Sequence, residues 1–401
     1  MSKKRGGKKV RVDFRQNRND RARSDDWTRR FHAEDNRLAD ATSKESVRAK
    51  GALSRKRTVI ESDADGAAAE EASWIRGVVT IVHGLICYVE DAEAKVWSCT
   101  VRRILRTRSI DTRSPVTVGD EVWFAATADS DQERTGVIER VAERRSLLSR
   151  RDRRARAHAI VANADQLLIV ASVAQPGLKP HLIDRYIVAA LAGNLAPLIC
   201  FNKIDLRADD RIELEDLEEL AVGDEPQRMP RPTIESVIGE LRGLGYRCLE
   251  TSAARGDGID ELREAMRGRT TVLSGQSGVG KSSLLNAVQP GLALRTAEVS
   301  VDNEKGKHTT THARLIRLDA GGYVVDTPGV RAFELWDVAT GDLEAHFPEI
   351  ASRVAHCRYG DCLHIDESDC AVRAAAESGE ISERRYWSYR KMLADAGETR
   401  R

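Results

Sequence analysis

Short apolar runs that alternate with polar positions follow one another between residues 74 and 149. Turn signals such as Gly119-Asp120 separate the runs, and this pattern is typical of β-strands. Five short strands in so short a stretch fit a small β-barrel, and an OB-fold is the leading prediction. The expected strands are Ile75–Val82, Leu85–Glu90, Lys95–Val101, Glu121–Ala126 and Gly136–Val141.

Beyond residue 164 the pattern changes to apolar strands that alternate with amphipathic helices. This alternation predicts an α/β domain with a mostly parallel sheet covered by helices. Strands are expected at Gln166–Val173, Ala196–Phe201, Tyr246–Thr251, Thr270–Ser274, Arg314–Leu318 and Tyr323–Asp326. Helices are expected at His181–Leu191, Ile234–Leu244, Ile259–Met266 and Lys281–Val288. The charged, Pro-containing stretch Arg207–Pro232 breaks the rhythm and is interpreted as a surface insertion.

The last part of the chain has a helical pattern that His and Cys residues interrupt. Helices are expected at Gly341–Ala355, Ala371–Ser378 and Ser382–Ala394. The helices are short and the apolar residues are few, so this region needs a further source of stability.

The formal net charge of +1 hides an uneven distribution of charge. Residues 1–57 contain 19 Lys or Arg against 8 Asp or Glu, a net charge of +11, and few apolar residues. Such a stretch is typical of a disordered basic arm, and an acidic, Ala-rich linker, Glu61–Ser73, follows it. The arm either contacts nucleic acid or is a solvated tail. A cluster of arginines between residues 144 and 156 has the same two interpretations, an RNA-facing surface or a solvated connector.

The apolar pattern and the cysteines argue against a membrane-spanning, a secreted or a disulfide-rich protein. No apolar run is long enough to cross a bilayer, and no apolar segment follows the basic N-terminus as a secretory signal requires. The seven cysteines are an odd number, and three cluster near the C-terminus. This usage predicts a reduced, cytoplasmic protein with a metal site instead of a disulfide framework.

A glycine-rich string lies between a predicted strand and a predicted helix, which is the context that a phosphate-binding loop requires. Glycines allow backbone N–H groups to turn toward phosphates, and the helix N-terminus adds partial positive charge. Lys281 is expected to reach the β- and γ-phosphates, and the Ser282 hydroxyl to bind Mg²⁺. The string, hereafter the P-loop, is Gly275, Gln276, Ser277, Gly278, Val279, Gly280, Lys281 and Ser282.

A second motif indicates which base is bound. Asn202-Lys203-Ile204-Asp205 follows a predicted strand, and Thr251-Ser252-Ala253 follows another. The Asp205 carboxylate can accept two hydrogen bonds from guanine N1–H and N2, a donor pair that adenine lacks. Lys203 is expected to lie along the base plane, Asn202 to brace neighbouring loops, and the Ala253 N–H to meet the guanine O6.

Two further segments complete the nucleotide site. Asp326-Thr327-Pro328-Gly329 follows an apolar strand; its aspartate suits a water-mediated contact to Mg²⁺, and the Gly329 N–H can sense the γ-phosphate. The string Gly306–His312 lies between it and the P-loop and reads as a switch. One hydroxyl from this string completes the Mg²⁺ shell. Thr310 is favoured, with Thr309 and Thr311 as alternatives.

The order of these motifs is unusual, because the guanine-reading motif precedes the P-loop. That order resembles the circularly permuted GTPases, and most closely the RsgA (also called YjeQ) family, over Trp74 to about Ala394. The resemblance implies an OB-fold, a permuted GTPase domain and a C-terminal zinc domain. It also implies late maturation of the small ribosomal subunit, with GTP hydrolysis that the subunit stimulates.

The residue that positions the attacking water is left open. Ras-like proteins place a glutamine after the DTPG glycine, but Val330 stands there, so slow intrinsic turnover is expected. We hypothesise that His308 positions the water once the ribosome orders the switch. The alternative is that His308 contacts only RNA or solvent.

Near the C-terminus Cys357, Cys362, His364 and Cys370 are spaced as C-x4-C-x-H-x5-C. Three thiolates and one imidazole fill a tetrahedral shell, which suits one structural Zn²⁺ ion without an open position for water. His356 is a weaker candidate ligand. The remaining cysteines, which are expected in the core, are Cys87, Cys99, Cys200 and Cys248.

Together these patterns predict a multidomain, monomeric, cytoplasmic GTPase with four parts. The parts are a basic arm and linker (1–73), an OB-fold barrel (74–149), a permuted GTPase domain (150–333) and a helical zinc domain (334–401). The expected partners are GTP or GDP with Mg²⁺ and the small ribosomal subunit with its rRNA, and no membrane. The alternatives are a GTP-dependent RNA-binding scaffold with negligible turnover, or a permuted GTPase that acts on the large subunit.

Overall fold

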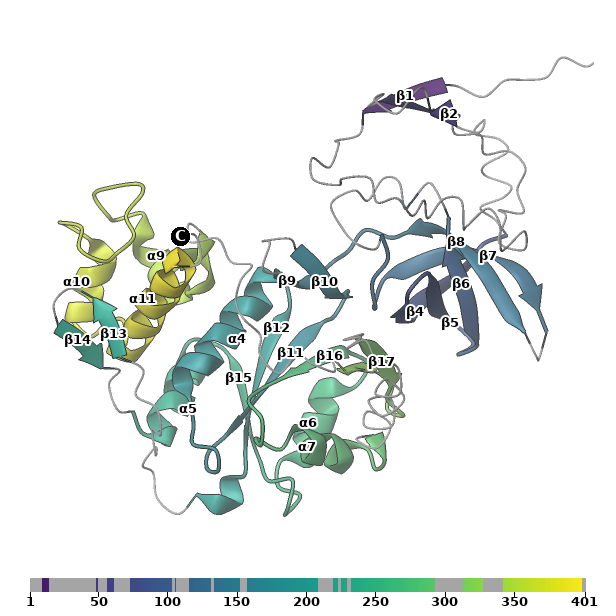
Figure 1. The fold of residues 1–401 in the computed structure, drawn as a ribbon. Helices are drawn as coiled ribbons and strands as arrows, with labels where there is room; N and C mark the ends of the chain where they lie inside the picture. Colours follow the sequence, from purple (N-terminus) through teal and green to yellow (C-terminus); the bar gives the residue numbers. More distant parts are fainter. Residues whose placement is uncertain are drawn as a thin grey trace, which may run out of the picture. The chain divides into compact units, whose positions relative to one another are not determined.

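A computed structural model describes most of the chain after residue 72 (Figure 1). The described residues are 9–13, 48–49, 56–60, 73–102, 105, 115–130, 133–151, 157–207, 219–222, 225–228, 232–292, 313–326 and 342–398. Two compact units divide the chain. The first takes in residues 1–77, 85–115 and 122–141, and the second takes in residues 78–84, 116–121 and 142–401.

Five strands form the predicted barrel, and its strand order is that of an OB-fold. The order is β4-β5-β6-β8-β7, and a further pairing of β7 with β4 closes it. β6 and β8 run parallel, whereas β5 and β6, and likewise β7 and β8, are antiparallel. The strands are β4 (Ile75–His83), β5 (Ile86–Asp91), β6 (Val96–Val101), β7 (Glu121–Asp129) and β8 (Arg134–Val141).

The barrel interior follows from the alternation seen in the sequence. Trp97 and Phe124 are buried with their ring centroids 5.3 Å apart. Gly136 lies beside them, where a Cβ atom would come within 2.9 Å of Phe124 Cδ2. On the outer face, the Arg140 guanidinium stacks 3.9 Å from the centre of the Trp123 ring.

A mostly parallel sheet forms the centre of the second unit, as the alternating pattern predicted. Its order is β15-β12-β11-β16-β18-β17, and only β17 runs antiparallel to its neighbour in that series. The strands are β11 (Gln166–Ser172), β12 (Ala196–Asn202), β15 (Arg247–Thr251), β16 (Thr270–Ser274), β17 (Arg314–Arg317) and β18 (Tyr323–Asp326).

Helices cover both faces of this sheet because successive side chains of a strand point to opposite faces. Leu167 and Ile169 of β11 pack into one apolar cluster with α4 (Pro180–Ala192) and α5 (Ile234–Gly243). Leu168 and Val170 pack into another with α6 (Ile259–Met266) and α7 (Lys281–Val288). All seven residues of β11 are buried, and the five between Gln166 and Ser172 are apolar because both faces of the strand are covered.

The connections bring the polar motifs to one edge of the sheet. The chain first adds β12 and β15 on one side of β11, then crosses back to place β16 and β18 on the other side. In open α/β sheets, ligands bind beyond the carboxyl ends of the strands where the order reverses. The P-loop follows β16 at this position, next to the end of β11.

The C-terminal helices surround a small core of their own. They are η3 (Glu344–His346), α9 (Pro348–Val354), α10 (Ala371–Glu377) and α11 (Glu383–Glu398). The single helix expected at Gly341–Ala355 is wrong, because Phe347 separates η3 from α9. Phe347 has an extended conformation, and Pro348 occupies the first turn of α9, where a missing N–H is tolerated.

Several short strands were not predicted. β9 (Leu147–Arg151) and β10 (Ala157–Ala162) form an antiparallel pair, as do β13 (Glu219–Val222) and β14 (Glu225–Arg228) within the predicted insertion. β1 (Lys9–Asp13), β2 (Arg48–Ala49) and β3 (Lys56–Ile60) form a small sheet. Among the described residues, no helix has the length and apolar character needed to cross a membrane.

Candidate functional site

The P-loop conformation requires glycine at two positions. Gly275 has a φ of +144°, and a Cβ atom there would lie 2.2 Å from the Val170 carbonyl oxygen. Gly280 has a φ of +94°, and a Cβ atom there would lie 2.5 Å from Asn202 Nδ2. Any larger residue would therefore push the loop away from the sheet edge or from Asn202.

Lys281 begins α7 and turns its side chain back over the loop. Its Nζ donates to the carbonyl oxygens of Gly275 and Gln276 at 2.6 and 2.7 Å. The Ser282 hydroxyl lies next to it in the first turn of α7 and is exposed. The loop therefore presents an ammonium group and a hydroxyl at a helix N-terminus, which suits a phosphate and its cation.

Asn202 joins the P-loop to the loop that follows β15 through side-chain hydrogen bonds. Its Nδ2 donates to the Val279 carbonyl oxygen at 2.9 Å. Its Oδ1 accepts from Thr251 Oγ1 at 3.2 Å and from the Ala253 N–H at 3.3 Å. Asn202 is 1% exposed, so these hydrogen bonds are shielded from water.

Asp205 is held by the loop after β15, and Lys203 is held by the segment between β11 and α4. Asp205 Oδ1 accepts from the Ser252 hydroxyl at 2.5 Å, and Ser252 Oγ accepts from the Arg255 N–H at 3.1 Å. This holds the Asp205 carboxylate, which lies in η1 (Ile204–Leu206) just after β12, in place before any ligand binds. Lys203 has a left-handed backbone, φ +64°, and its Nζ donates to the Gln175 carbonyl oxygen.

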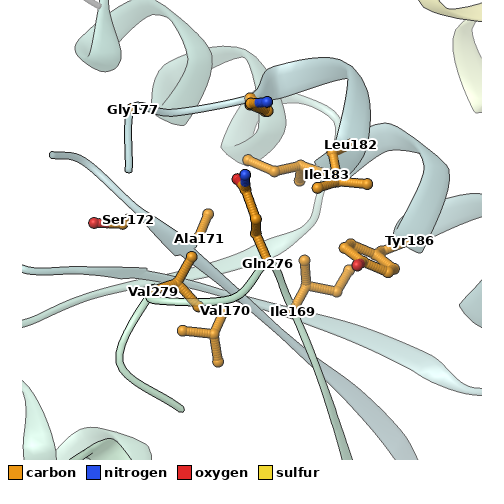
Figure 2. Close-up of a pocket in the computed structure, with 11 residues that line it drawn as sticks. Ile169, Val170, Ala171, Ser172, Gly177, Leu182, Ile183, Tyr186, Gln276 and Val279 are labelled. Atoms are coloured by element: carbon orange, nitrogen blue, oxygen red, sulfur yellow. The ribbon is translucent and has the colours of Figure 1, made fainter. Parts of the chain in front are cut away.

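A pocket lies between the P-loop and α4, with about 270 Å³ of space that opens to solvent (Figure 2). Figure 2 shows the Gln276 side chain reaching from the loop toward Leu182 and Ile183 of α4. The pocket is lined by Ile169, Val170, Ala171, Ser172, Gly177, Lys179, Leu182, Ile183, Tyr186, Gln276 and Val279. The P-loop therefore lies against α4 on one side and against Asn202 on the other.

Part of the predicted site lies outside the described residues. This applies to His308, to Thr309, Thr310 and Thr311, and to Gly329. The backbone of Asp326 ends β18, whose neighbour β16 leads into the P-loop.

The four predicted zinc ligands converge at one point in the C-terminal region. Their donor atoms all lie within 4.8 Å of one another. Cys357 Sγ is 3.6 Å from His364 Nδ1 and 3.9 Å from Cys370 Sγ, and His364 Nδ1 is 3.4 Å from Cys370 Sγ. A tetrahedral zinc shell separates neighbouring donor atoms by roughly 3.5–3.8 Å, given its bond lengths. The cluster, completed by Cys362, thus fits a tetrahedral metal ion.

The tautomer of His364 is set by a residue that the sequence did not reveal. His364 Nε2 lies 3.0 Å from Glu344 Oε2, and its Nδ1 points into the cluster. A carboxylate in this position fixes the orientation of a metal-binding imidazole and raises its basicity. His356, the weaker candidate ligand, is exposed and is not part of the cluster.

The remaining cysteines lie in the core, as predicted. Cys87, Cys99, Cys200 and Cys248 are all buried. Burial raises the pKa of the Cys200 thiol to about 12 and that of Cys248 to about 11. Such thiols stay protonated and inert near neutral pH. All seven cysteines are free.

A buried group of charges also went unpredicted. Asp184 of α4 is fully buried, and its two oxygens accept from Arg384 Nη1 at 2.6 Å and Arg385 Nη1 at 2.7 Å. Arg384 Nε also donates to Glu240 of α5 at 2.7 Å, and Arg385 Nε to Glu349 of α9 at 2.6 Å. These five residues, hereafter the Asp184 cluster, join α11 to two helices of the sheet.

Charges and burial shift two pKa values at this contact. Burial alone would raise the pKa of Asp184, but Arg384 and Arg385 hold it below its usual value. The pKa of His181, one turn earlier on α4, is lowered to about 3. Burial is the main cause, Asp184 opposes it, and Arg185, Lys391 and Arg384 add to the lowering. The His181 ring packs edge-on against Trp387, with centroids 5.2 Å apart.

Comparison with known proteins accounts for both the fold and the motifs. Residues 141–336 match the RsgA GTPase family. A small ribosomal subunit biogenesis GTPase RsgA from Bacteroides fragilis is 35% identical over 326 residues, which cover 81% of this chain and 98% of that protein. The chain belongs to the RsgA GTPase family. Membership of this family makes it a GTPase.

Further RsgA relatives agree in sequence and in structure. The RsgA of Thermotoga petrophila is 38% identical over 319 residues, which cover 79% of this chain and 95% of that protein. The crystal structure of YjeQ from Thermotoga maritima matches with a TM-score of 0.60 and 33% identity, covering 80% of this chain and 98% of that one. The crystal structure of YloQ, described as a circularly permuted GTPase, matches with a TM-score of 0.59 and 28% identity, covering 82% of this chain and 96% of that one. Both confirm the permuted fold that the motif order predicted.

Proposed function

We propose that the chain binds the small ribosomal subunit and its rRNA, assists late maturation of the subunit, and hydrolyses GTP to GDP and phosphate. The subunit stimulates turnover, and the protein works as a monomer in the cytoplasm. The names of the RsgA relatives support the choice of partner. The seven free cysteines suit a reducing compartment.

One observation carries the assignment of the nucleotide site. A single buried side chain, Asn202, hydrogen-bonds to the P-loop and to the loop after β15, and Asp205 follows it by three residues. Phosphate-binding and guanine-reading groups are thereby held at one edge of the sheet, as a guanine nucleotide requires.

In this proposal each part of the site has a separate task. The backbone N–H groups of Gly275–Lys281 and the Lys281 ammonium bind the phosphates. Asp205 accepts from guanine N1–H and N2, and the Ala253 N–H meets O6. Lys203 covers the base, while Asn202 and Ser252 position the loops.

Hydrolysis needs groups that orient water and neutralise the developing charge. Mg²⁺, when bound, neutralises charge on the β- and γ-phosphates, and Ser282, Thr310 and Asp326 would hold it. Gly329 senses the γ-phosphate, and His308 positions the attacking water when the switch is ordered by the ribosome. Val330 in place of a glutamine accounts for slow turnover in the absence of the subunit.

In the C-terminal region we propose one structural Zn²⁺ ion on Cys357, Cys362, His364 and Cys370. The convergence of the four donor atoms supports this choice, since three thiols and an imidazole suit zinc. The ion would fasten the loop between α9 and α10 to a core too small to hold it alone.

The proposal is tested by measuring phosphate release with purified small subunits, with large subunits and with neither. We expect stimulation by small subunits alone, and a loss of that stimulation in His308→Ala. Stimulation by large subunits instead would contradict the partner. GTP-dependent binding to small subunits without phosphate release would identify a scaffold, and an unchanged single-turnover rate in His308→Ala would remove His308 from the mechanism.

A further inference from the structure

Helix α4 presents different faces to the P-loop and to the C-terminal region. Leu182, Ile183 and Tyr186 line the pocket against Gln276 and Val279 of the P-loop (Figure 2). His181, Asp184 and Val188 recur at helical spacing and face the other way. The helix is largely buried along its length, so both contacts are made by one packed element.

The face of α4 that carries His181, Asp184 and Val188 packs against the C-terminal helices through three kinds of contact. His181 packs on Trp387, Asp184 binds Arg384 and Arg385, and Val188 belongs to the apolar core of the C-terminal helices. A buried ion pair resists separation strongly, because parting the two charges leaves each of them buried without its partner.

The same segment of α11 also holds the metal-binding loop. The Tyr386 hydroxyl donates to the His364 carbonyl oxygen at 2.6 Å, and the Tyr389 hydroxyl donates to the Leu363 carbonyl oxygen at 3.2 Å. Arg384 points to α4 and α5, Arg385 points to α4 and α9, and these tyrosines point to the ligand loop. Fewer than two turns of α11, Arg384 to Tyr389, therefore contact both the metal-binding loop and α4.

A bound nucleotide would change the hydrogen bonds that Lys281 and Lys203 make near α4. Lys281 Nζ donates to the Gln276 carbonyl, and Lys203 Nζ donates to the Gln175 carbonyl, five residues before α4 begins. A phosphate would draw the Lys281 ammonium away from the Gln276 carbonyl, and the Gln276 side chain lines the pocket against α4. A guanine base would lie along the stem of Lys203, whose Nζ holds the segment that leads into α4.

We propose that α4 and α11 couple the nucleotide site to the metal cluster, and that Asp184 is the positioning residue that holds the two helices together. The proposal rests on the guanine-nucleotide site described above. Coupling between two sites is reciprocal: nucleotide must strengthen metal binding by the same free energy by which metal strengthens nucleotide binding.

The test uses the full-length, metal-loaded protein and measures two quantities. One is the affinity for zinc, measured at equilibrium in competition with a chelator, with and without GDP. The other is the affinity for a fluorescent GDP analogue before and after zinc removal. We expect GDP to raise the affinity for zinc, and zinc removal to lower the affinity for GDP, each by the same factor, on the order of fivefold or more.

Asp184→Asn should abolish both effects while the variant still binds GDP and zinc separately. Arg384→Gln, which leaves the contact between Asp184 and Arg385 in place, should reduce them and serves if Asp184→Asn does not fold. The matched control is Arg353→Ala, which removes an exposed ion pair with Glu380 inside the C-terminal region and should leave both effects intact.

Three results would overturn the coupling. They are GDP binding that is independent of zinc in the wild-type protein, coupling that survives in Asp184→Asn, or equal loss of coupling in Arg353→Ala. Failure of the wild-type protein to bind GDP at all would instead refute the nucleotide site itself, and the coupling with it.

Discussion

The Asp205 side chain is held in place before a nucleotide binds, because the Ser252 hydroxyl donates to its Oδ1 at 2.5 Å. We expect Asp205→Asn to lower the affinity for GDP at least tenfold, since an amide cannot accept from both guanine N1–H and N2. The amide should favour xanthine, which offers an N1–H donor and an O2 acceptor. Competition binding with GDP and XDP would measure the change of preference.

The matched control for this change is Asp257→Asn, a carboxylate in the loop after β15 whose side chain is exposed. It should leave the preference for guanine intact. If Asp205→Asn retains the wild-type preference, Asp205 does not read the base.

His181 gives the folded protein a specific dependence on pH. Its pKa is about 3 in the folded state against an ordinary 6.5, so between these values the unfolded chain binds a proton that the folded chain does not. The free energy of unfolding should therefore fall as the pH drops through this window, by about 1.4 kcal/mol per unit from this residue.

His181→Phe should remove that part of the dependence while keeping a ring against Trp387. Urea unfolding between pH 4 and pH 7 would measure it as a shallower slope of stability against pH. The loss below pH 4 that arises from Asp184, whose pKa is lowered, should remain in the variant. An unchanged slope would show that His181 is already charged when the protein is folded.

At the level of elements, η3 supports the metal loop through one carboxylate. We expect Glu344→Gln to weaken zinc binding by about tenfold to a hundredfold, because an amide holds the His364 imidazole less firmly and does not raise its basicity. A competition titration with a chromogenic chelator would measure the affinity. Glu377→Gln is the control, since Glu377 pairs with Arg373 on the exposed side of α10; an equal loss in both variants would contradict this role.

The sequence predicted the bounds of the two elements that flank the P-loop, but it did not predict several other elements. β16 (Thr270–Ser274) and α7 (Lys281–Val288) have the predicted bounds because the P-loop marks both. The hairpin of β9 and β10 was missed, since arginines between its strands hide the alternation of apolar residues. The break at Phe347 was also missed, although Pro348 signals a helix start.

At the scale of the whole molecule, we expect a mutation that destabilises one compact unit to leave the other unit unaffected. Gly136→Ala would place a methyl group within 2.9 Å of Phe124 Cδ2 and 3.2 Å of Cys99 Sγ. We expect this overpacking to destabilise the barrel by about 1–3 kcal/mol. GDP affinity should stay at the wild-type value, because the loops of the nucleotide site belong to the other unit.

Calorimetry and GDP titration of the same sample would measure both quantities. Gly239→Ala, in α5 with open space around the new methyl group, should leave the barrel transition unchanged. A drop in GDP affinity in Gly136→Ala would mean that the barrel supports the nucleotide site.

The Asp184 cluster shows what local patterns leave out at this scale. Asp184 and Arg384 are 200 residues apart, and neither lies in a recognisable motif. The aspartate looks like an ordinary polar position on an amphipathic helix, and Arg384-Arg385 looks like a solvated pair. Only the packing of α11 on α4 shows that all three side chains are buried.

That burial also constrains how the family can change over evolution. A substitution that neutralises Asp184 alone would leave two guanidinium groups inside the protein, and loss of one arginine would leave its acidic partners short of positive charge. Single replacements should therefore be eliminated, and tolerated changes should occur together. In an alignment of RsgA sequences, we expect positions 184, 240, 349, 384 and 385 to covary as one unit, and sequences with an apolar residue at 184 to lack both arginines.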